Sequence, residues 1–270
     1  GSPDSKALVL CGGKFGERWA KVCRSYGIQH TAHQMEWGTG PDGNLVQELL
    51  DRDPAIDTVI VTHSETSTAA VADLQAISAV TRQRECLLVV DGITSVGALP
   101  LKMDEWGVDV VVTGSQKALM TPPGLGFVWV SDKAVAACRG SDLATPYWNW
   151  EKRIFADYYY EHFAGTAPTH HLFGLRESLT MILDEEGLPQ VWARHKALAG
   201  AVWAAFDTWG LGGDLALNIA DPAHRGHSVT AAKIGNGGAG RLRQWCETQA
   251  GVTLGIGLGS EWAGRVSGER

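Results

Sequence analysis

The fold is decided by residues 87–117, which read LLVVDGITSVGALPLKMDEWGVDVVVTGSQK. Two mostly apolar runs, Leu87–Val90 and Val108–Val112, are each followed by polar residues. Runs without regular polar alternation are typical of strands buried on both faces of a parallel sheet. The carboxyl ends of such strands are where open α/β sheets bind ligands. The stretch therefore predicts a ligand site that contains Asp91 and Lys117.

The same pattern continues on both sides of this stretch. Further short apolar runs lie at Ala7–Leu10, Thr58–Thr62 and Phe127–Val130. Val71–Gln83 carries apolar residues at helical spacing, and Glu17–Tyr26 also reads as a helix. Strands that alternate with helices indicate βαβ units. We therefore expect an α/β fold whose mostly parallel sheet forms a large domain, residues 1–187.

The C-terminal part of the chain has a different pattern. Apolar residues within 172–182 and 191–209 step by three or four, which predicts two helices. After Gly210, glycine-rich turns surround short apolar segments and one more helical stretch, Arg241–Gln249. We therefore expect a small α+β domain over residues 188–270.

The composition limits the classes of function. The 270 residues are 44% hydrophobic and 20% charged, and the formal net charge is −7. This excess of acidic residues disfavours a general binder of nucleic acid or anionic membranes, and no apolar run approaches the ~20 residues of a membrane span. Five scattered cysteines without a CxxC pair predict a reducing, cytoplasmic compartment rather than a disulfide framework or a zinc site. The histidine spacings match no metal motif, so we expect no metal.

Five motifs in the chain belong together. They are GKFGERW at 13–19, VTHSETST at 61–68, VVDG at 89–92, MDEWGVD at 103–109 and GSQKALMTPPG at 114–124. In this combination the chain resembles the class V aminotransferases of fold type I, and most closely their alanine–glyoxylate and serine–glyoxylate branch. The resemblance implies pyridoxal 5′-phosphate as cofactor. It also implies transfer of an amino group from alanine or serine to glyoxylate or a similar small keto acid.

The resemblance assigns roles around residues 87–117. Lys117 would form the Schiff base with the cofactor, which an amine can do only when neutral. Asp91 would face the pyridine nitrogen and keep it protonated, so that the ring accepts electrons from the substrate carbanion. Phe15 would stack on one face of the ring, and Ile93 would lie on the other.

The remaining implied contacts concern the cofactor's edge and its phosphate. Ser67 and Thr68 match the family's small hydroxyl residues at the oxygen-bearing edge, and Gln116 matches an amide beside the phosphate. Thr166 matches a family residue that reaches across a dimer interface and contacts the phosphate of the cofactor in the partner subunit. It lies in a stretch that we call the aromatic-rich segment, residues 139–168. The resemblance therefore implies a homodimer.

Two parts of the family pattern find no match in the chain. They are the Gly/Ser/Thr-rich loop that holds the phosphate at a helix N-terminus and the arginine that binds the substrate carboxylate. We therefore expect a chain truncated at both ends. One alternative is a fragment of such an enzyme that folds and dimerises without turnover.

A second alternative within the same fold is a lyase similar to the cysteine desulfurases. Those enzymes carry a histidine directly before the Schiff-base lysine and a nucleophilic cysteine on a mobile loop. Here Gln116 precedes Lys117, and none of the five cysteines has that loop context. The sequence therefore favours the aminotransferase.

Overall fold

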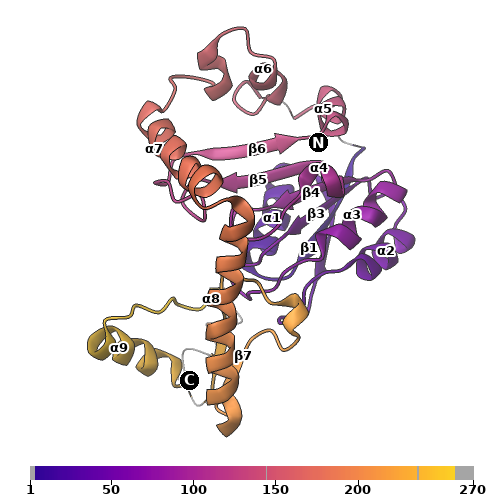
Figure 1. The fold of residues 1–270 in the computed structure, drawn as a ribbon. Helices are drawn as coiled ribbons and strands as arrows, with labels where there is room; N and C mark the ends of the chain where they lie inside the picture. Colours follow the sequence, from indigo (N-terminus) through magenta and orange to yellow (C-terminus); the bar gives the residue numbers. More distant parts are fainter. Residues whose placement is uncertain (1–3, 144, 236, 259–270) are drawn as a thin grey trace.

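A six-stranded sheet organises the N-terminal half of the molecule (Figure 1). The structure is a computed structural model that describes residues 4–143, 145–235 and 237–258. The strand order is β2-β1-β3-β4-β5-β6; all neighbours pair in parallel except β6, which is antiparallel to β5. The strands are β1 (Lys6–Cys11), β2 (Gln29–Gln34), β3 (Thr58–Thr62), β4 (Leu87–Asp91), β5 (Val110–Gly114) and β6 (Gly126–Val130). The predicted α/β fold with a mostly parallel sheet is confirmed.

Helices cover both faces of this sheet, which explains the strands without regular polar alternation. On one face Val9 of β1 packs with Ala20 of α1 (Lys14–Ser25). On the other face Leu8 belongs to a buried cluster with Val46 of α2 (Gly43–Arg52) and Ile77 of α3 (Leu74–Gln83). The short helix α4 (Met103–Trp106) leads from β4 to β5. Successive residues of each central strand therefore meet different cores.

Three elements of this half, β2, α2 and the short α4, were missed by the sequence analysis. Strand β2 reads QHTAHQ, without a single Val, Ile or Leu, because it lies at the sheet edge and pairs only with β1. Helix α2 begins after Asp42, whose carboxylate accepts a hydrogen bond from the Leu45 N–H. Helix α3 begins at Leu74 rather than at Val71, because Asp73 caps it.

The C-terminal half extends away from the sheet along one long helix, α8 (Leu188–Trp209), as Figure 1 shows. It begins after Gly187, whose φ of +84° is a conformation that favours glycine. Residues 252–258 form neither helix nor strand. The predicted domain boundary at 187/188 stays a prediction. The other elements of this half are α5 (Asp132–Arg139), α6 (Trp150–Ile154), η1 (Tyr159–Phe163), α7 (Thr169–Thr180), η2 (Met181–Glu185), η3 (Gly210–Gly212), β7 (Leu215–Leu217), η4 (Pro222–His224), β8 (Ala232–Ile234) and α9 (Ala239–Ala250).

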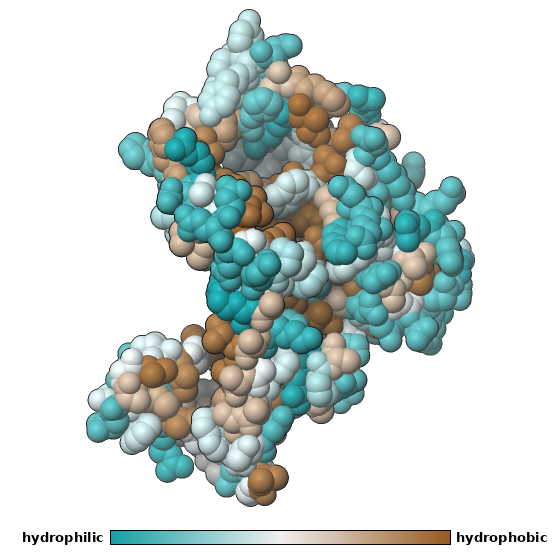
Figure 2. Space-filling view, in the orientation of Figure 1, coloured by the Kyte–Doolittle hydropathy of each residue, from teal (hydrophilic) through white to brown (hydrophobic). Residues whose placement is uncertain are grey.

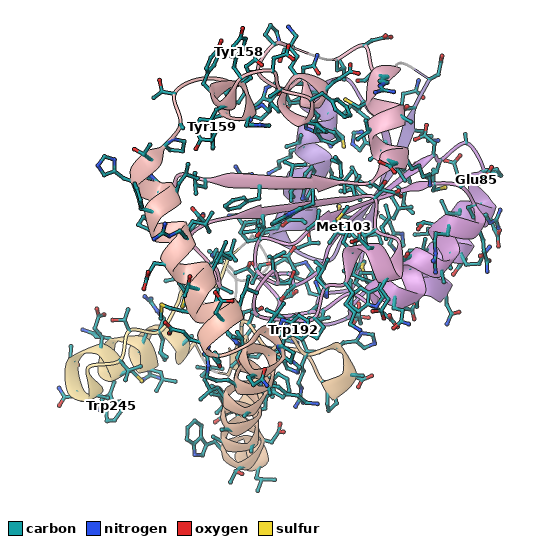
Figure 3. All side chains as sticks on the ribbon, turned by 45° about the horizontal axis from the view of Figure 1, so that its top comes forward. Glu85, Met103, Tyr158, Tyr159, Trp192 and Trp245 are labelled. Atoms are coloured by element: carbon teal, nitrogen blue, oxygen red, sulfur yellow. The ribbon has the colours of Figure 1, made fainter. Side chains whose placement is uncertain are left out.

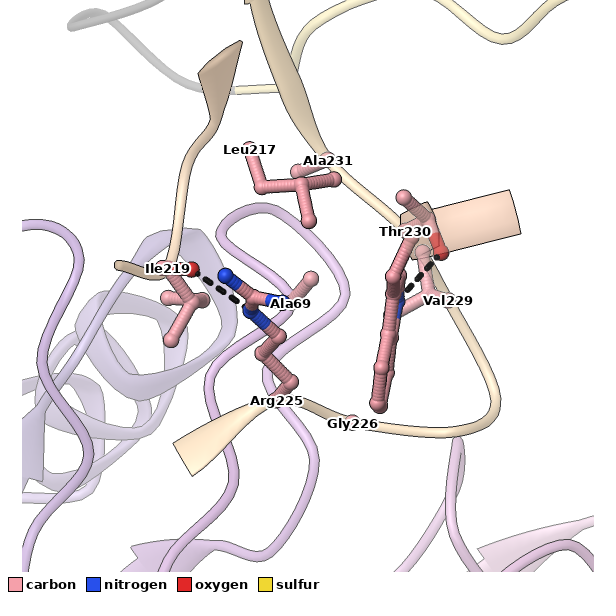
Figure 4. Close-up of a pocket in the computed structure, with 9 residues that line it drawn as sticks. Ala69, Leu217, Ile219, Arg225, Gly226, Val229, Thr230 and Ala231 are labelled. Carbon is pink, nitrogen blue, oxygen red and sulfur yellow. Dashed lines mark hydrogen bonds between the residues drawn. The ribbon is translucent and has the colours of Figure 1, made fainter. Parts of the chain in front are cut away.

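Residues near Arg225 join this half to the sheet. The Arg225 guanidinium lies 5.6 Å from the centre of the Trp203 ring and donates to the carbonyl oxygen of Ile219 at 2.9 Å (Figure 4). The side-chain amide of Asn218 donates to the carbonyl oxygen of Thr68 at 2.8 Å. The loop between β3 and α3 is therefore hydrogen-bonded to the C-terminal half.

Two further features bear on the predicted location. Among the described residues, no helix combines the length and the apolar character that crossing a membrane requires. All five cysteines carry free thiols. The cytoplasmic compartment stays a prediction.

Candidate active site

Asp91 is a buried carboxylate at the carboxyl end of β4. Its Oδ2 accepts a hydrogen bond from the Trp19 indole N–H at 2.8 Å, and its Oδ1 accepts one from the Ile93 N–H at 3.1 Å. Burial raises the pKa of Asp91, while these two hydrogen bonds and the charge of Arg18 act in the opposite direction. The carboxylate is thus held in one orientation, and each oxygen keeps a lone pair for a further donor.

Lys117 lies in the turn after β5, the strand next to β4. The side chain is exposed, and its ammonium makes no hydrogen bond or ion pair with any described residue. Ser115 fixes the turn, because its hydroxyl donates to the Pro122 carbonyl at 2.7 Å and accepts from the Leu125 N–H at 3.2 Å. Gln116 is exposed beside Lys117. An exposed lysine side chain without a partner among the described residues therefore stands on a hydrogen-bonded turn at the carboxyl end of β5, beside the carboxyl end of β4.

The loop after β3 carries three successive hydroxyl residues, and they differ in accessibility. The Ser67 hydroxyl donates to Glu65 at 2.7 Å, and the Thr68 hydroxyl donates to the Gly12 carbonyl at 3.3 Å; both residues are buried. Thr66 is partly exposed, and its hydroxyl lies 2.6 Å from that of Thr94 in the loop after β4. Of these three residues, Thr66 is therefore the most accessible.

Helix α1 brings two aromatic side chains toward this edge. Phe15 is half-buried in the first turn, and its N–H donates to Glu65 Oε2 at 3.1 Å. Trp19 lies one turn later, on the same side of the helix, and reaches Asp91. Hydrogen bonds therefore join three of the expected contact regions, namely the start of α1 and the segments that follow β3 and β4, while Lys117 follows the adjacent strand β5.

Thr166 is not among the residues brought together. It is exposed in the aromatic-rich segment, between η1 and α7. Figure 2 shows the molecule hollowed between this segment and the sheet, with hydrophobic residues on the walls of the hollow. Thr166 therefore has no described partner among the site residues of its own chain.

The donor set fits a cofactor that has a basic ring nitrogen and an aldehyde. Asp91 offers a fixed acceptor to a ring N–H, and Lys117 offers a free amine to an aldehyde carbon. Near Asp91, the buried hydroxyl oxygens of Thr62 and Ser95 have no hydrogen-bond partner among the described residues. Unpaired buried polar atoms are uncommon and mark places that a ligand or water completes. The residues present thus fit pyridoxal phosphate.

A mostly parallel sheet with Asp91 and Lys117 at the carboxyl ends of adjacent strands is the arrangement that the resemblance to pyridoxal-phosphate enzymes of fold type I leads us to expect. The chain belongs to the family Aminotransferase class-V, whose model matches residues 17–261. The predicted family is confirmed, and it implies the predicted cofactor, pyridoxal 5′-phosphate.

Individual relatives carry related names. The chain is 35% identical to L-aspartate–glyoxylate aminotransferase of Paracoccus denitrificans, and the match covers 98% of this chain and 66% of that protein. It is also 35% identical to serine–glyoxylate aminotransferase of Methylorubrum extorquens, over 97% of this chain and 66% of that protein. The chain thus spans about two thirds of the length of these relatives.

Solved structures show the same architecture. Alanine–glyoxylate aminotransferase from Nostoc sp. superposes with a TM-score of 0.85 at 25% identity, over 96% of this chain and 68% of that one. Pyridoxamine–pyruvate aminotransferase from Mesorhizobium loti gives a TM-score of 0.84 at 27% identity, over 96% of this chain and 65% of that one.

Proposed function

We propose that the protein is an aminotransferase that moves an amino group from alanine, serine or a similar small amino acid to glyoxylate or a similar small keto acid. The observation that carries this proposal is the pair formed by a buried, hydrogen-bonded Asp91 and a free Lys117 amine at the ends of two adjacent parallel strands. Relatives named for glyoxylate as partner substrate support the acceptor. Their names differ in the donor, so the donor is proposed only as a class.

Each residue of the pair has a separate task in this proposal. Bound pyridoxal phosphate supplies an electron sink for the electrons of the donor's Cα–H bond. Asp91 Oδ1 or Oδ2 accepts the ring N–H and keeps that proton in place. Lys117 Nζ would hold the cofactor through its aldehyde. When the donor's amine takes its place, Nζ would be free to accept and return the proton of the donor's Cα.

Further residues would orient the ring. We propose that Phe15 and Ile93 lie on its two faces and that Gln116 lies beside the phosphate. We propose that Ser67 and Thr68 lie at the oxygen-bearing edge, and that Thr66, partly exposed in the same loop, offers a further hydroxyl there. The hydroxyls of Ser67 and Thr68 also hold the loop through Glu65 and the Gly12 carbonyl.

A homodimer belongs to the same proposal. Thr166 serves a phosphate only if that phosphate belongs to a second copy. The aromatic-rich segment supplies apolar surface for such an interface, and Figure 3 shows Tyr158 and Tyr159 on it, at the opposite end of the molecule from Trp245. Its exposed large side chains are Leu143, Tyr147, Trp148, Ile154, Phe155, Tyr158, Tyr159 and Tyr160. Light scattering that shows only monomer at micromolar concentration would count against the dimer.

The proposed function is tested by trapping the cofactor. Pyridoxal phosphate is added to the chain, the visible absorbance band is recorded, and borohydride reduction followed by peptide mass spectrometry locates the adduct. We expect the adduct on Lys117. An adduct on another lysine, or none, overturns the proposal.

Assays with glyoxylate and alanine, serine or aspartate then separate the alternatives. Glycine formation supports the aminotransferase, whereas a trapped adduct without any turnover supports the non-catalytic fragment. Release of sulfide from cysteine would support the lyase.

A further inference from the structure

Glu65 is a buried carboxylate that binds two segments at once. It is 3% exposed and lies in the loop after β3. Its Oε2 accepts hydrogen bonds from the N–H groups of Phe15 and Gly16, both at 3.1 Å. Its Oε1 accepts from the N–H of Ser67 at 3.1 Å and from the Ser67 hydroxyl at 2.7 Å. Four donors are thus satisfied by a single side chain.

These contacts replace a cap that helix α1 cannot make for itself. The residue before α1 is Gly13, which has no side chain to accept a hydrogen bond from the first turn. The Ser67 hydroxyl accepts from the Lys14 N–H at 3.0 Å, so Ser67 and Glu65 together serve three successive N–H groups. A negative charge at this end also suits the helix dipole.

Gly13 leaves the space that this arrangement needs. A Cβ atom at that position would lie 2.4 Å from Ser67 Oγ and 2.6 Å from Glu65 Cγ. These distances are too short for any real Cβ atom, so a side chain there would push the carboxylate off the helix.

The chemistry requires a carboxylate rather than an amide. Both oxygens of Glu65 accept, and each serves two donors. A glutamine has one acceptor oxygen, and its NH₂ group would face donors at the other position. The change from Glu65 to Gln therefore leaves buried N–H groups unsatisfied while the volume stays the same.

We infer that Glu65 is a positioning residue for the cofactor. It ties the backbone of Phe15, the proposed stacking residue, to the loop whose next residue is Thr66, the proposed edge contact. One side chain that does not itself touch the cofactor therefore sets the spacing between the residue proposed for the ring face and the residue proposed for the ring edge. This inference rests on the proposed function.

The main test is Glu65→Gln in the full chain, with Asp42→Asn as matched control. Asp42 caps α2 through the Leu45 N–H at 2.9 Å, on the sheet face opposite α1. We expect Glu65→Gln to weaken pyridoxal phosphate binding by about 10- to 100-fold and to change the visible circular dichroism of the bound cofactor, which reports its stacking. Asp42→Asn, which keeps an acceptor oxygen at the N-cap of α2, should show neither effect.

Ser67→Ala is the milder second variant, which carries the test if Glu65→Gln does not fold. It should weaken binding several-fold with a circular dichroism change in the same direction. If a folded Glu65→Gln, or else Ser67→Ala, binds like wild type with an unchanged spectrum, the inference is overturned while the proposed function stands. If wild type itself binds no pyridoxal phosphate, both are overturned.

Discussion

The sheet and the aromatic-rich segment are built on different principles. In β4, Leu88 and Val90 are fully buried in the core that lies between the sheet and helices α2 and α3. None of the described residues of α6 and η1 is buried, and Ile154, Tyr159 and Tyr160 are exposed. The sheet thus has its own core, whereas the described residues of the segment form none. The candidate site lies at the carboxyl ends of the sheet's parallel strands, whereas Thr166 lies in the aromatic-rich segment.

The largest expected effect concerns Lys117, at the carboxyl end of β5, and it affects turnover but not stability. Lys117→Ala removes the covalent anchor and the proton carrier, so turnover should fall by several orders of magnitude. Because Lys117 is exposed and unpaired among the described residues, the melting temperature of the cofactor-free chain should not change. Transaminase assays and thermal unfolding measure both, with Lys21→Ala as an exposed lysine control. Near wild-type turnover of Lys117→Ala would end the assignment.

The contrast in burial predicts opposite results for two truncations. Leu88→Ala opens a cavity in the core and should cost about 2–5 kcal/mol of unfolding free energy. Phe155→Ala in the aromatic-rich segment should cost less than ~0.5 kcal/mol in the monomer but weaken self-association. Denaturant unfolding and sedimentation measure the two quantities. Equal losses of stability would show that the segment has a core of its own.

A pH effect is expected from His63 at the end of β3. The residue is buried, its Nδ1 has no partner among the described residues, and burial lowers its pKa from 6.5 to about 4. The unfolded chain therefore binds a proton more readily than the folded one between pH 6.5 and 4, so stability is lost as pH falls through this window. The loss from this group is about 3 kcal/mol.

His63→Leu should remove that contribution. The unfolding free energies of wild type and variant are compared at pH 7 and pH 4. The variant's advantage should grow as pH falls. A constant difference across the two pH values would refute the assignment to His63.

The smallest expected effect tests whether Trp19 acts on Asp91 through its hydrogen bond or only packs in the site. Trp19→Phe keeps a ring but removes the N–H that lowers the pKa of Asp91. The pKa of Asp91 should rise, so the acid limb of pyridoxal phosphate binding should move to higher pH, with affinity at neutral pH falling about 2- to 10-fold. Trp203→Phe, which loses the indole bond to Thr230 far from Asp91, is the control. An unchanged acid limb would show that Trp19 only packs.

The sequence predicted those strands and site residues that short local patterns determine. Apolar runs gave β1, β3, β4 and β6 nearly to the residue, and motifs placed Asp91 and Lys117 at one sheet edge. It missed β2, because an edge strand without aliphatic residues carries no pattern. Helix α2 was also missed, although Asp42 and the apolar residues that follow it were a readable signal.

Partners distant in the sequence could not be predicted in this way. Trp19 and Asp91 are 72 residues apart, and Phe15 and Glu65 are 50 apart. No local sequence pattern indicates which residues form such pairs. The accessibility of three adjacent hydroxyl residues likewise depends on loop conformation, which turns Ser67 and Thr68 inward and leaves Thr66 partly exposed.

The borrowed cap of α1 has a consequence for the order of folding. Because its first N–H groups are satisfied by a residue 50 positions away, the helix cannot complete its first turn until β3 has docked beside β1. Closing that loop costs entropy before the cap repays any of it. Helix α1 should therefore become fully ordered late on the folding pathway, although it precedes β3 in the chain. Amide protection at Phe15 and Gly16 would then appear together with that of β3.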